Sequence, residues 1–222
     1  MAKSKKKLKR SSKWMLSLVA IIILLMTVYF MNQSTSTKGF KIEAQPHLGE
    51  ETAPVEIIQF GDYKCPSCKT FTESFFPLIQ DELIATGKAR FYFVNDPFIQ
   101  ADSKRAAEFA ETVYHELGND VFWQFHHVLY EQQPKDKELE KQEVYTPKFL
   151  IETLSGLVSE EDTNQVIKAF KKGAGEGAVK TDRSFADEMN VSGTPALFVD
   201  GKRFKGSTIS ELKEMVDQST NE

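Results

Sequence analysis

Residues 55–68 have the sequence VEIIQFGDYKCPSC, and the rest of the chain can be placed around them. The first six residues are mostly apolar or β-branched, which predicts a buried strand, and GDYK forms the turn after it. A helix is predicted from Cys68 to Ile84, where apolar residues recur at helical spacing. The only two cysteines, Cys65 and Cys68, therefore lie where a strand ends and a helix begins. A thiol there is close to the positive end of the helix dipole and to unpaired backbone N–H groups, which stabilise the reactive thiolate.

The composition separates a basic N-terminus from an acidic remainder. The chain has 222 residues, 41% of them hydrophobic and 17 of them Phe, enough for one large domain or two small ones. Residues 1–13 hold seven basic and no acidic residues, so the remaining chain has 21 basic and 32 acidic residues. A net charge of −11 on that remainder argues against a nucleic-acid partner.

The basic tail is followed by a candidate membrane span. Residues 14–31 are eighteen uncharged, mostly apolar residues. As a helix they would be about 27 Å long, close to the thickness of a bilayer core. The basic residues 1–13 should then stay in the cytoplasm, with a tether and edge strand at 32–52 exported beyond the membrane. A cleaved signal peptide is the alternative, although no clear A-x-A site follows.

The remaining pattern predicts a small α/β unit, 53–102 and 173–222, interrupted by a helical domain at 103–172. A short edge strand is also expected at Phe40–Ile42. The predicted elements after the first helix are a strand at Ala89–Val94, helices at Ser103–Leu117, Val121–Glu131, Thr146–Leu154, Glu161–Lys171 and Lys180–Met189, strands at Ala196–Val199 and Arg203–Phe204 joined by an Asp-Gly turn, and a helix at Ser210–Gln218.

The C-x-x-C motif favours redox chemistry over a structural role. A disulfide between cysteines so close in sequence restrains little of the unfolded chain. A zinc site would need four ligands, and the four histidines lack the usual spacing. We therefore expect no metal ion, and no cofactor beyond a redox-active disulfide between Cys65 and Cys68.

Two separate motifs resemble the DsbA-like thiol-disulfide oxidoreductases. One is the stretch from Ala53 to Cys68, with Asp62-Tyr63 and the CPSC motif, and the other is VSGTPALFV at residues 191–199. The resemblance implies a thioredoxin fold with an inserted helical domain. It implies that Cys65 attacks and carries the mixed disulfide, and that Cys68 is buried and resolves it. It also implies that Pro195 is a cis-proline, which places the Thr194 backbone beside Cys65 to pair with an extended substrate.

Three residues around the cysteines should tune the thiols. Pro66 suits the first turn of a helix because it needs no N–H there. Ser67 stands where strongly oxidising relatives often have His, so it supplies no cation. Gln59 stands where many relatives carry a buried Glu or Asp, and the absence of that carboxylate should favour thiolate.

Other side chains near the motif have two interpretations each. Lys64 and Lys69 could supply a cation to the thiolate, but two solvated lysines are the preferred interpretation. Phe122, Trp123 and Phe125 could line a groove for unfolded chains, but aromatic residues at helical spacing are more often core residues.

The sequence thus predicts a membrane-anchored oxidase that gives disulfides to reduced exported proteins. Because the chain has no further cysteine, a partner must reoxidise it, and the resemblance suggests a quinone-linked membrane thiol oxidase. A disulfide reductase or isomerase is one alternative, which the missing His leaves open. A membrane-tethered holdase with an incidental disulfide is another.

Overall fold

The computed structural model describes residues 40–134 and 142–220. The predicted basic tail, the predicted membrane span at 14–31 and the first part of the tether lie outside the described residues. Within the described ranges, no helix is both long enough and apolar enough to cross a membrane.

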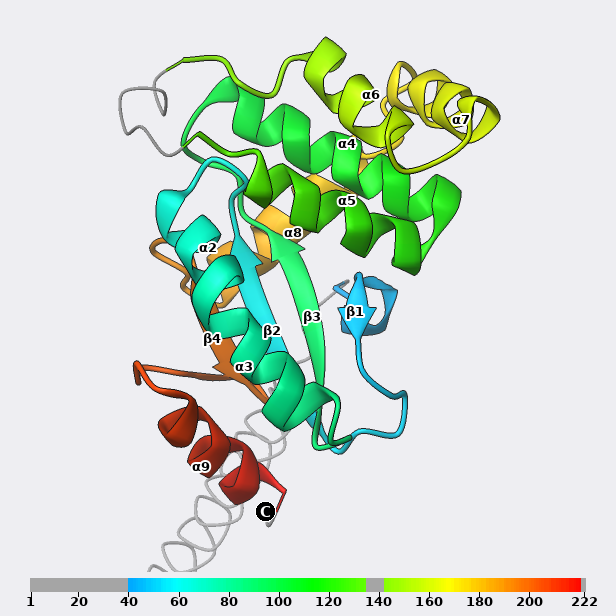
Figure 1. Ribbon diagram of the computed structural model, residues 1–222. Coiled ribbons are helices and arrows are strands. Elements are labelled where there is room, and N and C mark those ends of the chain that lie inside the picture. Colours follow the sequence, from blue (N-terminus) through cyan, green and yellow to red (C-terminus); the bar gives the residue numbers. More distant parts are fainter. Residues whose placement is uncertain (1–39, 135–141, 221–222) are drawn as a thin grey trace, which may run out of the picture. The chain divides into compact units, whose positions relative to one another are not determined.

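A mixed five-stranded sheet forms the centre of the described residues, with the order β1-β3-β2-β4-β5 (Figure 1). The central strands β2 and β3 are parallel, and the other neighbouring pairs are antiparallel. Both central strands are largely buried, which suits their apolar sequences. The strands are β1 (His47–Leu48), β2 (Val55–Gly61), β3 (Ala89–Asn95), β4 (Ala196–Val199) and β5 (Lys202–Arg203).

Helices connect and cover these strands. A continuous helical segment follows β2, with α2 (Pro66–Thr70) and α3 (Phe76–Ile79) each followed by a π-helical turn, Phe71–Phe75 and Gln80–Ile84. In the described residues between β3 and β4 the helices are α4 (Ala101–Leu117), α5 (Asn119–Glu131), α6 (Pro147–Ser155), α7 (Glu160–Phe170) and α8 (Glu176–Glu188). The last helix is α9 (Ile209–Ser219).

The predicted element order is confirmed, with one error at the first strand. The expected edge strand at Phe40–Ile42 is absent, and residues Ile42–Ala44 form a 3₁₀ turn instead. The Phe40 ring stacks on the ring of Phe185 in α8, with 3.8 Å between the two centroids. This segment therefore packs against α8 rather than pairing with the edge of the sheet. The edge strand is instead β1, where the side chains of Asn119 and Trp123 form hydrogen bonds with the His47 backbone.

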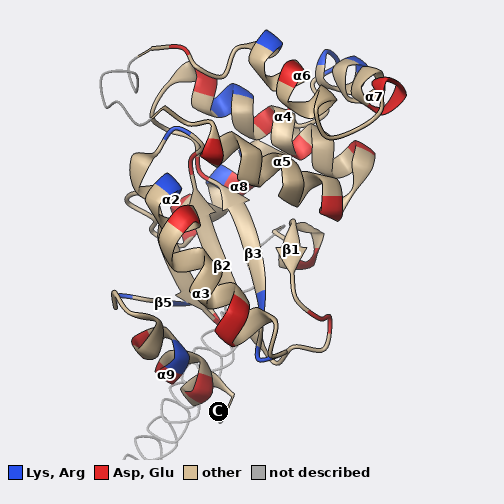
Figure 2. Cartoon of the chain, viewed as in Figure 1, with Lys and Arg blue, Asp and Glu red and all other residues tan. Residues whose placement is uncertain are grey.

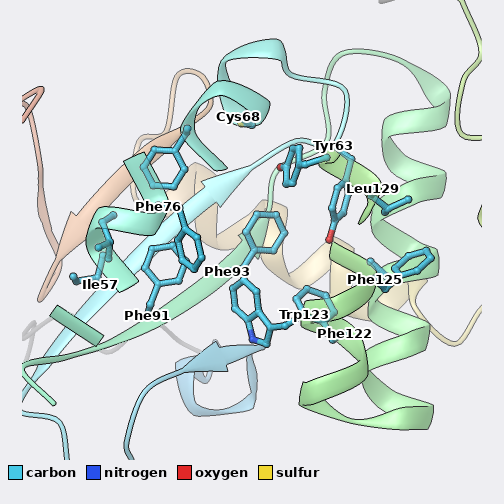
Figure 3. Close-up of a cluster of buried hydrophobic side chains, with 14 of the residues drawn as sticks. Ile57, Tyr63, Cys68, Phe76, Phe91, Phe93, Phe122, Trp123, Phe125 and Leu129 are labelled. Carbon is cyan, nitrogen blue, oxygen red and sulfur yellow. The ribbon is translucent and has the colours of Figure 1, made fainter. Parts of the chain in front are cut away.

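Two apolar clusters fill the two faces of the sheet. The larger joins β2 and β3 to α2, α3 and α5, and Figure 3 shows Phe76, Phe91 and Trp123 packed within it. Phe122, Trp123 and Phe125 are buried there, which confirms that they belong to the core. The smaller cluster lies between the other sheet face and α8. Charged residues are distributed over the helices, while β2 and β3 are almost free of them (Figure 2).

Candidate active site

The turn between β2 and α2 is organised by Asp62. Its backbone carbonyl accepts the N–H of Cys65 at 3.0 Å. Its buried carboxylate accepts the N–H of Lys64 at 2.8 Å and those of Phe98 and Ile99 at 3.0 and 3.2 Å. These bonds fix where Cys65 enters the helix.

The two cysteines occupy different environments at the start of α2. Cys65 is the N-cap residue and Pro66 is the first helical residue, as predicted for a proline without an N–H. The exposed fraction of Cys65 is 7%, whereas that of Cys68, almost one turn further along, is 0%. Both are free thiols. Cys65 is therefore the sulfur that another molecule can reach.

The loop before β4 brings a distant segment to Cys65. The Thr194–Pro195 peptide bond is cis, and the Thr194 carbonyl lies 3.2 Å from the Sγ of Cys65. The predicted cis-proline and the predicted proximity of Thr194 to Cys65 are both confirmed.

The two thiols have opposite acidities. A hydrogen bond from the Cys68 thiol is the main cause that lowers the pKa of Cys65 to about 6, and the Thr194 side chain and the N–H groups of Ser67 and Cys68 lower it further against the effect of burial. Burial, followed by the neighbouring Cys65, raises the pKa of Cys68 well above its ordinary value. At neutral pH the pair therefore holds a thiolate on Cys65 and a thiol on Cys68.

Gln59 lies in β2, on the sheet face to which Cys68 packs. It is paired in register with Phe93 of β3 and Leu197 of β4, both members of the larger apolar cluster, and is 1% exposed. Its Nε2 has no hydrogen-bond partner among the described residues. The position thus places a neutral amide, rather than a carboxylate, in the core near the thiols.

The interpretation of Lys64 and Lys69 as solvated residues is wrong. Both are buried, with exposed fractions of 3% and 6%. Lys64 pairs with Asp102 of α4, and Lys69 donates to the carbonyls of Tyr130 and Glu131 at the end of α5. A buried ammonium needs such partners, and the C-terminal carbonyls of a helix are favourable ones.

A groove beside the cysteines joins three segments that are distant in sequence. It has a volume of about 360 Å³ and lies between α2 with its π turn, the cis-proline loop and the segment after β5. Phe71, Phe75 and Phe204 give it apolar walls, and Ser67 and Pro195 lie in its lining. The groove could not be predicted from the sequence, because helical spacing identifies Phe71 and Phe75 of the π turn only as helix residues.

A buried polar cluster at the end of β3 contains neither cysteine. The Asn95 side chain at the end of β3 donates to Glu111 of α4 and to Asp182 of α8, and Gln45 also donates to Asp182. Burial is the main cause that raises the pKa of both carboxyl groups, to about 6 for Asp182. In the described residues, no group of three or more His, Cys, Asp or Glu side chains is arranged to hold a metal ion.

Comparisons with known proteins agree with this geometry. The sequence model of a family described as thioredoxin matches residues 41–218. The chain is 37% identical to disulfide bond formation protein D of Bacillus subtilis, covering 80% of this chain and 78% of that protein. It is 31% identical to a probable disulfide bond formation protein D of Bacillus anthracis, covering 91% and 92%.

Solved structures show the same architecture. The crystal structure of oxidised BdbD from Bacillus subtilis superposes with a TM-score of 0.73 at 35% identity, covering 82% of this chain and 96% of that one. DsbA from Chlamydia trachomatis, at 21% identity and a TM-score of 0.68, shares the fold. The predicted thioredoxin-like α/β fold with a helical insertion is therefore confirmed.

Proposed function

Because this chain belongs to the thioredoxin family and is a DsbA-like thiol-disulfide oxidoreductase, we propose that it donates disulfide bonds to reduced exported proteins. The observation that carries this proposal is the position of Cys65, the more accessible sulfur, at the N-cap of α2 beside Cys68 and the Thr194 loop, where the Cys68 thiol is the main cause that lowers its pKa to about 6. A stabilised thiolate favours the reduced enzyme, and so favours loss of the enzyme's disulfide to a substrate.

The reaction consists of two thiol–disulfide exchanges. A substrate thiolate attacks the Sγ of Cys65 in the Cys65–Cys68 disulfide, and the sulfur of Cys68 leaves and takes up a proton. A second substrate thiolate then attacks the substrate sulfur of the mixed disulfide, and Cys65 leaves as a thiolate. The substrate loses two electrons and gains a disulfide, and the enzyme gains those electrons as a dithiol. A low pKa makes Cys65 a good leaving group in the second step.

Substrate binding uses the cis-proline loop. In this proposal the backbone of Thr194 and Pro195 pairs with an extended segment around the substrate cysteine, a mode that tolerates many sequences. The adjacent groove, with its phenylalanine walls, receives an apolar side chain of the same segment. Such contacts suit unfolded chains, whose apolar residues are still exposed.

The proposal extends to location and to the reoxidising partner. Residues 14–31 anchor the protein in the membrane, with 1–13 in the cytoplasm and the enzyme outside. The chain has two cysteines and both are used in the exchange, so the electrons must pass to another protein. A quinone-linked membrane thiol oxidase would lie within reach of an enzyme tethered to the same membrane, and no cofactor besides the Cys65–Cys68 disulfide is required.

A trapping experiment tests the exchange and the role of each cysteine. In cells that express Cys68→Ser, the Cys65 thiolate can attack a disulfide of an oxidised substrate, whose other sulfur leaves as a thiolate. No thiol at position 68 can then resolve the mixed disulfide, so adducts should accumulate on non-reducing gels. Cys65→Ser is the matched control and should form none. Adducts that persist in Cys65→Ser, or are absent from both variants, would contradict these roles.

A further inference from the structure

Two residues just before Cys65 are tied to the helical insertion. Tyr63 and Lys64 are buried, although they belong to the turn that leads to the reactive cysteine. The Nζ of Lys64 contacts both carboxylate oxygens of Asp102, at 3.0 and 3.1 Å, and donates to the carbonyl of Gln142 at 2.6 Å. The lysine therefore links the turn to α4 and to the segment before α6.

That segment, Gln142–Tyr145, forms a strap across the turn. The carboxylate of Asp102 also accepts the N–H groups of Val144 and Tyr145, at 2.8 and 3.2 Å. The fully buried Tyr145 side chain donates its hydroxyl to the carbonyl of Tyr63 at 2.7 Å and contacts the carbonyl of Leu129 in α5 at 3.3 Å.

We propose that Tyr145 and the Lys64–Asp102 pair are positioning residues, which hold the turn so that the sulfur of Cys65 meets the N–H groups of α2 and the cis-proline loop. The inference rests on the proposed function, in which Cys65 is the reacting thiol. Tyr145 belongs to the predicted helical domain at 103–172, and Asp102, the last residue of the predicted α/β unit before it, lies in α4.

Few residues separate the contacts of Tyr145 and Asp102 from the sulfur of Cys65. Tyr63 lies two residues before Cys65, and Lys64 is its direct neighbour. The pKa of Cys65 is lowered mainly by the hydrogen bond from the Cys68 thiol, and further by the Thr194 side chain and the N–H groups of Cys68 and Ser67. Hydrogen bonds weaken steeply as distance and angle depart from their optimum. A turn released from the strap should move Cys65 relative to these donors, and its pKa should rise.

The first test is Tyr145→Phe, which removes one hydroxyl and no charge. Thiolate absorbance of the full-length reduced protein is measured as a function of pH. The pKa of Cys65 should be raised by about half a unit, a free-energy change smaller than that of one typical hydrogen bond. Tyr92→Phe is the matched control. The Tyr92 hydroxyl accepts a hydrogen bond from Arg90 on the other face of the sheet, so its loss should leave the pKa of Cys65 unchanged.

The second test is the double variant Lys64→Met with Asp102→Asn. The pair is removed together, so no unpaired buried charge remains and the net charge near Cys65 is conserved. A raised pKa of Cys65 in this variant supports positioning and decides the question if Tyr145→Phe does not fold. A folded variant of either kind with the wild-type Cys65 pKa would overturn the proposal.

The thiolate titration separates this inference from the proposed function. It needs no substrate, so an acidic pKa of Cys65 in the wild-type protein, together with no mixed disulfides in Cys68→Ser, would refute the proposed function alone. A raised pKa together with slower exchange supports both. A lower melting temperature with an unchanged pKa would show that the strap stabilises the fold without positioning the thiol, and would reject the inference.

Discussion

At the scale of single residues, the main feature is the contrast between two thiols three positions apart. Cys65 caps the helix and receives hydrogen bonds, whereas Cys68 is enclosed by apolar side chains. Burial disfavours the charged form and hydrogen bonds to sulfur favour it, so the two pKa values move in opposite directions. The proposed reaction uses this difference, because Cys68 takes up a proton when it leaves and Cys65 leaves as a thiolate.

The pH dependence of Cys65 alkylation follows from this contrast. Because only thiolate reacts, the rate with iodoacetamide should rise with pH around a midpoint near the pKa of about 6. Cys68→Ala removes the largest cause of the lowered pKa and should move the midpoint upward, toward the ordinary value of 9.0. A wild-type midpoint near 9 would contradict the account.

Substitutions at Gln59 test whether the absence of a carboxylate matters. Gln59→Leu should leave the alkylation midpoint of Cys65 unchanged and the stability equal or higher, because it removes a buried amide whose Nε2 is unpaired. Gln59→Glu should raise the midpoint whenever the carboxyl is ionised, by like-charge repulsion. A shifted midpoint in the leucine variant would instead mean that the amide itself tunes the thiols.

At the scale of elements, the end of β2 is tightly enclosed. A Cβ at Gly61 would lie 2.5 Å from the Phe93 ring and 3.1 Å from the hydroxyl of Tyr130, so α5 and β3 leave room only for glycine. The active-site turn begins directly after this residue. The fit between β2, β3 and α5 therefore fixes the position from which the turn starts.

Gly61→Ala should destabilise the protein by about 1–3 kcal/mol through overpacking, measured by denaturant unfolding. Gly177→Ala in α8 is the control, because its Cβ would meet no atom within 4 Å. Alanine there should stabilise the helix by up to about 1 kcal/mol. Equal effects at the two positions would refute the packing argument.

How far the elements could be predicted depends on the range of the contacts involved. Helical and strand periodicity, caps and the Asp-Gly turn are local, so the element order and the hairpin were predicted; Asp200 and Gly201 both have the positive φ that this turn requires. The choice between Phe40–Ile42 and His47–Leu48 as edge strand depends on Phe185 and Asn119, which are far along the chain. No local pattern contains that information.

At the scale of the whole molecule, the same limit applies to the site. The two cysteines were found from spacing, and their meeting with Thr194 was expected from a family resemblance. The burial of Lys64 was missed because its partner Asp102 is 38 residues away and Gln142 lies 78 residues away. The groove was missed for the same reason, since its walls come from three separated segments.

The stability of the whole fold should depend on redox state and pH together. The pKa of Cys65 is lower in the folded reduced protein than its ordinary value of 9.0, so its contribution grows as pH rises from about 6 to 9 and is lost below about 6. The oxidised protein has no such titration. The melting temperature of the reduced form, relative to that of the oxidised form, should therefore rise between pH 5 and 8. A difference that stays constant over this range would contradict the lowered pKa.

The central claim is that the enzyme gives disulfides to substrates, and the reduction potential of the Cys65–Cys68 pair in glutathione buffers tests it most directly. The proposed oxidase predicts a potential well above that of thioredoxin and toward the value of about −120 mV for DsbA, the direction that the lowered pKa of Cys65 favours. A value near the about −270 mV of thioredoxin would identify a reductase. That result would overturn the proposed oxidase while leaving the fold and both cysteines in place.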